Sequence, residues 1–105
     1  MVDQNSLPEF QSRIHDWIKT HGGYWPPLAM FSAITEEIGE LAKEINHLEG
    51  FKPKKFKSEE GNVGEELADI LYALICIANY YKIDLNKELE NVIEKYSTRD
   101  SKRFI

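Results

Sequence analysis

The sequence predicts an all-α protein made of four helices in a single domain that spans residues 1–105. Apolar residues recur at three- and four-residue intervals over four separate stretches, which is the period of an amphipathic helix. Segments that contain glycine or proline separate the first three stretches, and none of the sequence shows strand-like alternation. A chain of 105 residues can bury only a modest core by itself.

The first expected helix opens at Ser6, because Ser6 and Glu9 form a capping box and Pro8 stands in the first turn. Gly22-Gly23 ends this helix, since glycine readily adopts the left-handed conformation that closes a helix. The aromatic turn Tyr24-Trp25-Pro26-Pro27 follows, and its prolines keep the backbone extended.

The second expected helix begins near Pro27, runs to about Leu48 and stops at Gly50, and it carries an apolar stripe together with four glutamates. At about 100° per residue, the centre of the stripe lies roughly 70° from Glu37, 90° from Glu44 and 130° from Glu40. Glu36 is about 170° away and therefore faces solvent most directly. The stripe consists of Phe31, Ile34, Ile38, Leu41, Ile45 and Leu48.

Residues 50–64 (G-F-K-P-K-K-F-K-S-E-E-G-N-V-G) differ in character from the helices around them. They contain three glycines, a proline and four lysines without a helical period, which predicts a mobile basic loop. Two interpretations are open for its lysines: a solvated surface loop, or a flap that closes over an anionic ligand.

The third expected helix runs from Gly64 or Glu65 to Tyr81, and its interior (I-L-Y-A-L-I-C-I-A) is apolar almost all the way round. A helix of this kind is buried on more than one side. Because the chain offers too little other material to cover it, we expect a homo-oligomer, either a homodimer or a homotetramer.

The fourth expected helix begins after Asp84, which is a good N-cap residue. The residues that follow the cap at helical spacing are Leu85, Leu89, Val92, Ile93 and Tyr96. The final residues 98–105 (T-R-D-S-K-R-F-I) form a basic tail.

Composition excludes several classes of function. The formal net charge of -5 argues against binding of a nucleic acid polymer, which normally requires a basic surface. The single cysteine, Cys76, cannot form an internal disulfide, and the pattern of Cys and His does not suggest a zinc site. A secretory signal is not recognisable, and the longest apolar run, residues 70–78, is too short to cross a membrane. We therefore expect a soluble, cytoplasmic protein.

Two pairs of carboxylates stand out on the second and third expected helices. Glu37 and Glu40 are three residues apart, as are Glu66 and Asp69, so each pair shares one helix face. If the two faces meet, they form an all-oxygen site that suits Mg²⁺ or Mn²⁺. The alternative is a solvated acidic face, and Glu66 in a first turn also gains from the helix dipole.

The same residues carry a family resemblance. E-E-x-x-E in Glu36-Glu37-Ile38-Gly39-Glu40, followed by E-x-x-D in Glu66-Leu67-Ala68-Asp69, resembles the signature of the MazG-like nucleotide pyrophosphohydrolases. These proteins belong to the all-α NTP pyrophosphatase superfamily. The likeness covers residues 24–104 and includes the later segments A-D-I-L-Y-A-L-I, A-N-x-x-x-I-D-L and K-Y-x-T-R-D, which are similar to the short YpjD-type members.

The resemblance implies a MazG-like four-helix bundle and Mg²⁺-dependent hydrolysis of a normal or modified (d)NTP to a nucleoside monophosphate and pyrophosphate. It implies a catalytic role for Glu36 and phosphate contacts for the basic residues of the chain's end. The implied metal ligands are Glu37, Glu40, Glu66 and Asp69, and the implied phosphate-binding residues are Lys95, Arg99 and Arg103.

Substrate recognition is less defined by the sequence. Trp25 precedes the acidic motif and either stacks on the base or fills the core, and Tyr24, Phe31 and His21 share this ambiguity. Lys95 and its basic neighbours either meet phosphates or complement a helix dipole.

The chain contains neither a P-loop sequence nor an arrangement of residues typical of a nucleophilic enzyme, so attack by metal-activated water is the expected mechanism. Two alternatives stay open. One is a pyrophosphohydrolase that acts on a phosphoribosyl-nucleotide in biosynthesis. The other is a non-catalytic oligomerisation or regulatory module, against which the complete set of four carboxylates argues.

Overall fold

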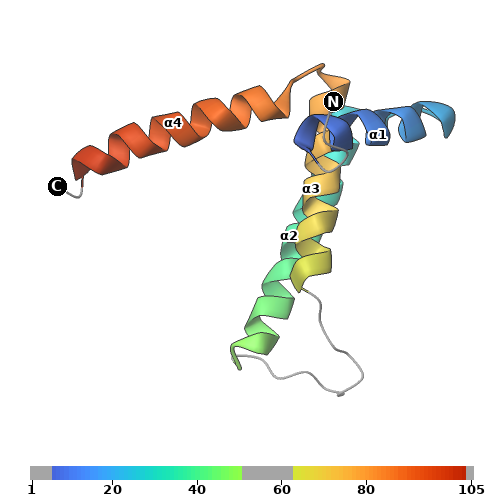
Figure 1. The fold of residues 1–105 in the computed structure, drawn as a ribbon. Helices are drawn as coiled ribbons and strands as arrows, with labels where there is room; N and C mark the ends of the chain where they lie inside the picture. Colours follow the sequence, from blue (N-terminus) through green and yellow to red (C-terminus); the bar gives the residue numbers. More distant parts are fainter. Residues whose placement is uncertain (1–5, 51–62, 104–105) are drawn as a thin grey trace.

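The computed structural model describes residues 6–50 and 63–103, which form four helices and two short links, with side chains described as far as Arg99 (Figure 1). This confirms the predicted all-α class, and the described residues contain no strand. The predicted basic loop lies almost entirely outside the described residues. The helices are α1 (Leu7–Thr20), α2 (Pro27–Leu48), α3 (Val63–Tyr80) and α4 (Leu85–Arg103).

The helix ends follow from local chemistry. The Ser6 hydroxyl accepts a long hydrogen bond of 3.4 Å from the Glu9 amide at the start of α1. Gly22 and Gly23 follow α1 with φ of 108° and 84°, values that favour glycine. Asp84 caps α4 by accepting from the Lys87 amide at 3.2 Å. α4 then continues through most of the basic tail, further than the apolar spacing alone indicated.

Helices α2 and α3 form an antiparallel hairpin that contains the core (Figure 1). Their apolar faces meet, and the residues buried between them and α1 are small or medium in size. This core is thin, because none of the described side chains is fully buried. The buried apolar residues are Met30, Ile34, Ile75, Cys76 and Ala78.

Helix α1 crosses the end of the hairpin and is fastened there by one buried glutamine (Figure 1). Gln11 Nε2 donates to Asn79 Oδ1 at 2.9 Å and to the Ile83 carbonyl at 3.0 Å. Its Oε1 accepts from the Leu85 amide at 3.0 Å, and Asn79 Nδ2 donates back to the Gln11 carbonyl. We call this network the Gln11 clamp; it joins α1 to both the end of α3 and the start of α4.

Helix α4 leaves the clamp and leads away from the hairpin, so most of its length lies against no other described helix (Figure 1). The radius of gyration is accordingly 17.3 Å, against about 13 Å for a compact domain of this length. None of the helices in the described residues is both long enough and apolar enough to cross a membrane.

Candidate active site

The antiparallel pairing of α2 and α3 brings three carboxylates together. Glu37 lies near the middle of α2, and Glu66 and Asp69 occupy the first two turns of α3. One carboxylate oxygen from each of the three lies within 4.8 Å of the other two. We call these three residues the carboxylate cluster. The cluster takes residues from both predicted carboxylate pairs, so the two acidic helix faces do meet.

Burial of the α2 glutamates follows their angle from the apolar stripe. Glu37 and Glu44 are half-buried, whereas Glu36 and Glu40 are exposed. Glu40 contributes no oxygen to the carboxylate cluster, but its negative charge acts on Glu66. The structure therefore places Glu37 at the centre of the acidic face, with Glu40 beside it and Glu36 on the solvent side.

The surroundings of Glu66 in the carboxylate cluster raise its pKa. Burial raises its pKa, and a hydrogen bond to the Glu37 carboxylate, which only protonated Glu66 can donate, raises it further. The negative charges of Glu37, Asp69 and Glu40 act in the same direction. A positive charge bound at this point would oppose the shift, because it favours the ionised form of Glu66.

The donor set fits a hard divalent cation. Glu66 Oε2 is shielded from solvent, and no N–H or O–H group of the described residues reaches it. The charges that act on Glu66 come from other carboxylates, and a cation bound among them would satisfy this oxygen. Around an octahedral Mg²⁺ ion with bonds of about 2.1 Å, ligand oxygens stand about 3.0 Å apart when adjacent and about 4.2 Å when opposite. Three oxygens that lie within 4.8 Å of one another are therefore close to the spacing that one such ion requires.

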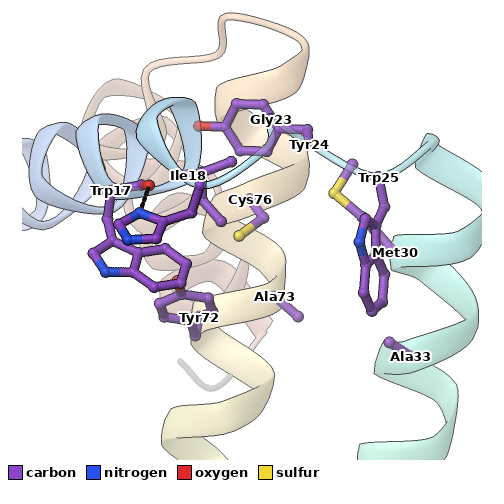
Figure 2. A pocket seen from close by; sticks show the side chains of 11 residues that line it. Trp17, Ile18, Gly23, Tyr24, Trp25, Met30, Ala33, Tyr72, Ala73 and Cys76 are labelled. Atoms are coloured by element: carbon purple, nitrogen blue, oxygen red, sulfur yellow. Dashed lines mark hydrogen bonds between the residues drawn. The ribbon is translucent and has the colours of Figure 1, made fainter.

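A pocket of about 320 Å³ opens on the same hairpin and is lined mainly by aromatic and apolar side chains. Trp25 and Met30 stand on one side of it, Trp17 and Tyr72 stand on the other, and Cys76 lies between them (Figure 2). We call it the aromatic pocket. Its two facing aromatic walls can hold a flat, apolar-faced ligand between them.

The aromatic pocket is one helical turn from the carboxylate cluster. Ala33 lines it from α2, four residues before Glu37, and Ala73 lines it from α3, four residues after Asp69. One turn of helix is about 5.4 Å along the axis. A single ligand can therefore occupy the aromatic pocket with one end and reach the carboxylates with the other.

Hydrogen bonds and stacking fix two walls of the aromatic pocket. The Tyr24 hydroxyl lies 2.7 Å from His15 Nδ1, and Tyr24 also hydrogen-bonds with Asn79 of the Gln11 clamp. Trp17 stacks on His21, with ring centroids 3.9 Å apart and planes 10° from parallel, and His21 Nδ1 lies 2.7 Å from the Trp17 carbonyl (Figure 2). The walls are therefore largely preformed.

Of the aromatic residues considered from sequence, His21, Tyr24 and Trp25 line the pocket and Phe31 does not. Trp17 and Tyr72 were missed as pocket residues. Trp17 follows the apolar period of α1 and Tyr72 lies inside the apolar run of α3, so their spacing indicated only core packing. Only the packing of α1 and α3 against α2 brings Trp17 and Tyr72 opposite Trp25.

Comparison with known proteins gives the family. Residues 26–104 match the model of the MazG nucleotide pyrophosphohydrolase domain. The chain belongs to the MazG nucleotide pyrophosphohydrolase family. It is also 38% identical over 104 residues to YpjD from Bacillus subtilis (strain 168), an alignment that covers 98% of this chain and 94% of YpjD.

Solved MazG-type structures share the fold as well. The crystal structure of YpjD from Bacillus subtilis superposes with a TM-score of 0.79 at 38% identity, covering 91% of this chain and 98% of YpjD. The Bacillus-conserved MazG protein, a nucleotide pyrophosphohydrolase, superposes with a TM-score of 0.74 at 34% identity, covering 90% and 92% of the two chains. The four-helix arrangement is therefore that of MazG-like proteins.

Lys95 and Arg99 of α4 are not brought to the carboxylate cluster of their own chain. Lys95 Nζ and Arg99 Cζ lie 4.8 Å and 4.5 Å from the centre of the Tyr96 ring. Their helix leads away from the α2–α3 hairpin (Figure 1). The Arg103 side chain lies outside the described residues. The predicted phosphate contacts of these three residues stay a prediction.

Proposed function

We propose that this MazG-type protein hydrolyses a nucleoside triphosphate, normal or modified, to the monophosphate and pyrophosphate with Mg²⁺ as its cofactor. One observation carries the proposal: three carboxylates from two helices converge to within 4.8 Å, one helical turn from an aromatic pocket. Family membership supports the reaction class, since a matched domain and a solved relative are both nucleotide pyrophosphohydrolases.

The carboxylate cluster is the proposed site of the cation, with Glu40 as the fourth ligand that the family motif implies. When bound, Mg²⁺ neutralises charge on the phosphates and lowers the pKa of a coordinated water, and Mn²⁺ can substitute because it prefers the same oxygen ligands. Glu37, Glu66 and Asp69 would hold the cation on the α2–α3 hairpin. Exposed Glu36 is proposed to accept a proton from the attacking water or to orient it.

The aromatic pocket is the proposed site of the nucleobase. Every nucleobase has a flat face that can stack on an aromatic side chain, and each such contact contributes about 1–3 kcal/mol to binding. Trp25 on one wall and Trp17 on the other are the residues best placed to do this. With the base held there, the phosphates extend along the α2–α3 seam toward the carboxylate cluster.

A nucleotide panel with Mg²⁺ tests the proposal. Normal and modified (d)NTPs, a phosphoribosyl-nucleotide and inorganic triphosphate are incubated with the protein, and pyrophosphate and the nucleoside monophosphate are quantified together. We expect equal amounts of both products from at least one nucleotide, and no cleavage of triphosphate that lacks a base. Glu65→Gln is the matched control for Glu66→Gln, because Glu65 precedes Glu66 but supplies no oxygen to the cluster.

The outcomes of the panel are distinct. Release of pyrophosphate by the wild type and by Glu65→Gln, but not by Glu66→Gln, supports the site and the reaction. Failure to release pyrophosphate from any nucleotide with either Mg²⁺ or Mn²⁺ would overturn the enzymatic proposal and favour the oligomerisation or regulatory module.

A further inference from the structure

His21 brings to the aromatic pocket a hydrogen-bonding group whose role is fixed by the fold. The residue caps the end of α1 and lines the pocket. Its Nδ1 lies 2.7 Å from the Trp17 carbonyl oxygen, and a carbonyl oxygen can only accept, so Nδ1 carries a proton. A neutral imidazole carries a single N–H group, so Nε2 of the neutral His21 ring is an acceptor.

Thr20 supports the same assignment of the proton. Its hydroxyl donates to the carbonyl oxygens of Asp16 and Trp17, at 3.2 Å and 2.9 Å. Because that hydroxyl proton is already engaged, Thr20 Oγ1 accepts from His21 Nδ1, which lies 2.9 Å away. The last turn of α1 therefore sets the tautomer of His21, and Nε2 is the ring nitrogen that a ligand can use.

The other polar side chains that line the aromatic pocket do not supply a fixed acceptor of this kind. The indole nitrogens of its two tryptophans only donate. The Tyr24 hydroxyl is already engaged by two neighbours. The Tyr72 hydroxyl can rotate to donate or to accept, and the Cys76 thiol is only a weak acceptor. His21 is therefore the side chain best suited to distinguish one ligand from another.

The stack of His21 on Trp17 orients this acceptor toward the edge of a bound base. The two ring planes are 10° apart, with their centroids at 3.9 Å. A base that lies beside the His21 ring, in the same layer, is therefore also nearly parallel to the Trp17 indole. The lone pair of Nε2 lies in the plane of the ring, so it meets the edge of such a base, where the hydrogen-bonding groups are.

An acceptor at the edge of the base distinguishes two classes of nucleobase. Adenine, cytosine and guanine each carry an exocyclic amino group, which donates hydrogen bonds, whereas thymine carries carbonyl oxygens, which accept them. Uracil has the same carbonyl groups as thymine. A carbonyl oxygen facing His21 Nε2 would set two acceptors against each other, an arrangement that disfavours the wrong ligand.

We propose that His21 selects nucleotides whose base carries an exocyclic amino group, by accepting a hydrogen bond from that group at Nε2. This selection rests on the proposed function, because it requires the base to occupy the aromatic pocket. One hydrogen bond between neutral groups contributes about 2- to 10-fold in affinity. His21 thus ranks bases by their edge, whereas the tryptophans hold every base by its face.

Binding of nucleoside monophosphates tests the selection without turnover. AMP differs from purine riboside monophosphate, and GMP from IMP, only by an amino group, whereas CMP carries an amino group where UMP carries a carbonyl. Calorimetry without divalent cations gives the dissociation constants at about pH 8, where a histidine ring is normally neutral. We expect the wild type to bind the amino-bearing member about 2- to 10-fold more tightly in at least one pair.

Two variants of His21 separate its hydrogen bond from its stack. His21→Phe keeps a flat ring beside Trp17 but removes both nitrogens, so the members of each pair should bind about equally. His21→Gln carries an amide oxygen that can accept, so part of the preference should return. His47→Phe is the matched control, because it makes the same exchange at a histidine that does not line the pocket, and it should keep the full preference.

Three results would overturn the selection: equal binding within every pair by the wild type, an undiminished preference in His21→Phe, or a preference equally absent from His21→Phe and His21→Gln. A preference that His21→Phe loses, His21→Gln partly restores and His47→Phe keeps supports it. Selective binding without release of pyrophosphate would contradict only the enzymatic proposal. Release of pyrophosphate without selective binding would contradict only the role of His21.

Discussion

The carboxylate cluster and the aromatic pocket lie one helical turn apart on the same hairpin, yet they are built in different ways. The cluster takes all its residues from α2 and α3, at positions fixed by helix periodicity. The pocket takes residues from α1, the turn after it, α2 and α3, and its walls exist only once α1 crosses the hairpin. The proposed metal site is thus locally encoded, whereas the proposed base site depends on tertiary packing.

This difference separates what each region should control. The carboxylate cluster concentrates negative charge, and we propose that it serves the chemical step. The aromatic pocket offers stacking surfaces, and we propose that it binds the substrate. If the account is correct, substitutions in the first region lower kcat and cation affinity, and substitutions in the second raise KM and leave cation affinity unchanged.

The largest effect is expected in the carboxylate cluster. Asp69→Asn or Glu37→Gln removes a proposed cation ligand with little change in side-chain volume. Loss of a residue that only supports a metal ligand lowers activity up to about 100-fold, so loss of a ligand itself should lower kcat by at least that factor. Steady-state kinetics at saturating nucleotide measure this loss. Circular dichroism should show an unchanged helix content. If both variants keep wild-type kcat, the cluster is not the site of the chemistry.

A smaller effect is expected in the aromatic pocket. Trp25→Ala removes one stacking wall, and KM for the nucleotide should rise about 5- to 150-fold, the equivalent of the 1–3 kcal/mol that stacking contributes per base. Trp25→Phe retains an aromatic face and is the matched control. Calorimetry with Mg²⁺ alone should give the same affinity for both variants. An unchanged KM in Trp25→Ala would remove the base from this pocket.

The Gln11 clamp should affect the two regions unequally. Gln11→Leu leaves Asn79 Oδ1 and the Leu85 amide without their partner, so we expect a loss of about 1–3 kcal/mol in the free energy of unfolding. Thermal denaturation measures this loss. Because the clamp positions α1, a wall of the aromatic pocket, KM should rise severalfold while Mg²⁺ affinity stays constant. A parallel fall in Mg²⁺ affinity would contradict the separation of the two regions.

The smallest effect concerns pH. Since the pKa of Glu66 is raised in the folded protein, folding favours its protonated form. Its contribution to the stability of the metal-free protein is therefore complete below the ordinary pKa of glutamate and is lost as pH rises through the raised value. Chemical denaturation of the metal-free protein across this range should show the decline, and Glu66→Gln should reduce it.

The predictable part of the structure is the part governed by local periodicity. The predicted range of α2, from near Pro27 to about Leu48, agrees with the structure, because proline begins the helix and glycine follows it closely. The order of burial of Glu36, Glu37 and Glu44 followed from their angles around the helix. The convergence of Glu37 with Glu66 and Asp69 required only that two predicted faces meet.

The rest depends on residues that are distant in sequence. Gln11 hydrogen-bonds with groups 68 to 74 positions away, and its own neighbourhood in the sequence carries no signal of this. Trp17 and Tyr72 obey an apolar period and gave no sign of lining a pocket. The direction of α4 is likewise set by the Gln11 clamp and the left-handed Lys82 at φ 58°, so its departure from the hairpin was not predictable.

Calorimetric titration of the metal-free protein with Mg²⁺ tests the central claim most directly. We predict saturable binding by the wild type and a gain of about 2.7 kcal/mol in folding free energy at 100 times the dissociation constant. We also predict that Glu66→Gln loses this binding and that Glu65→Gln keeps it. Equal Mg²⁺ binding by Glu66→Gln and the wild type, or no binding by the wild type, would contradict a metal site at the carboxylate cluster.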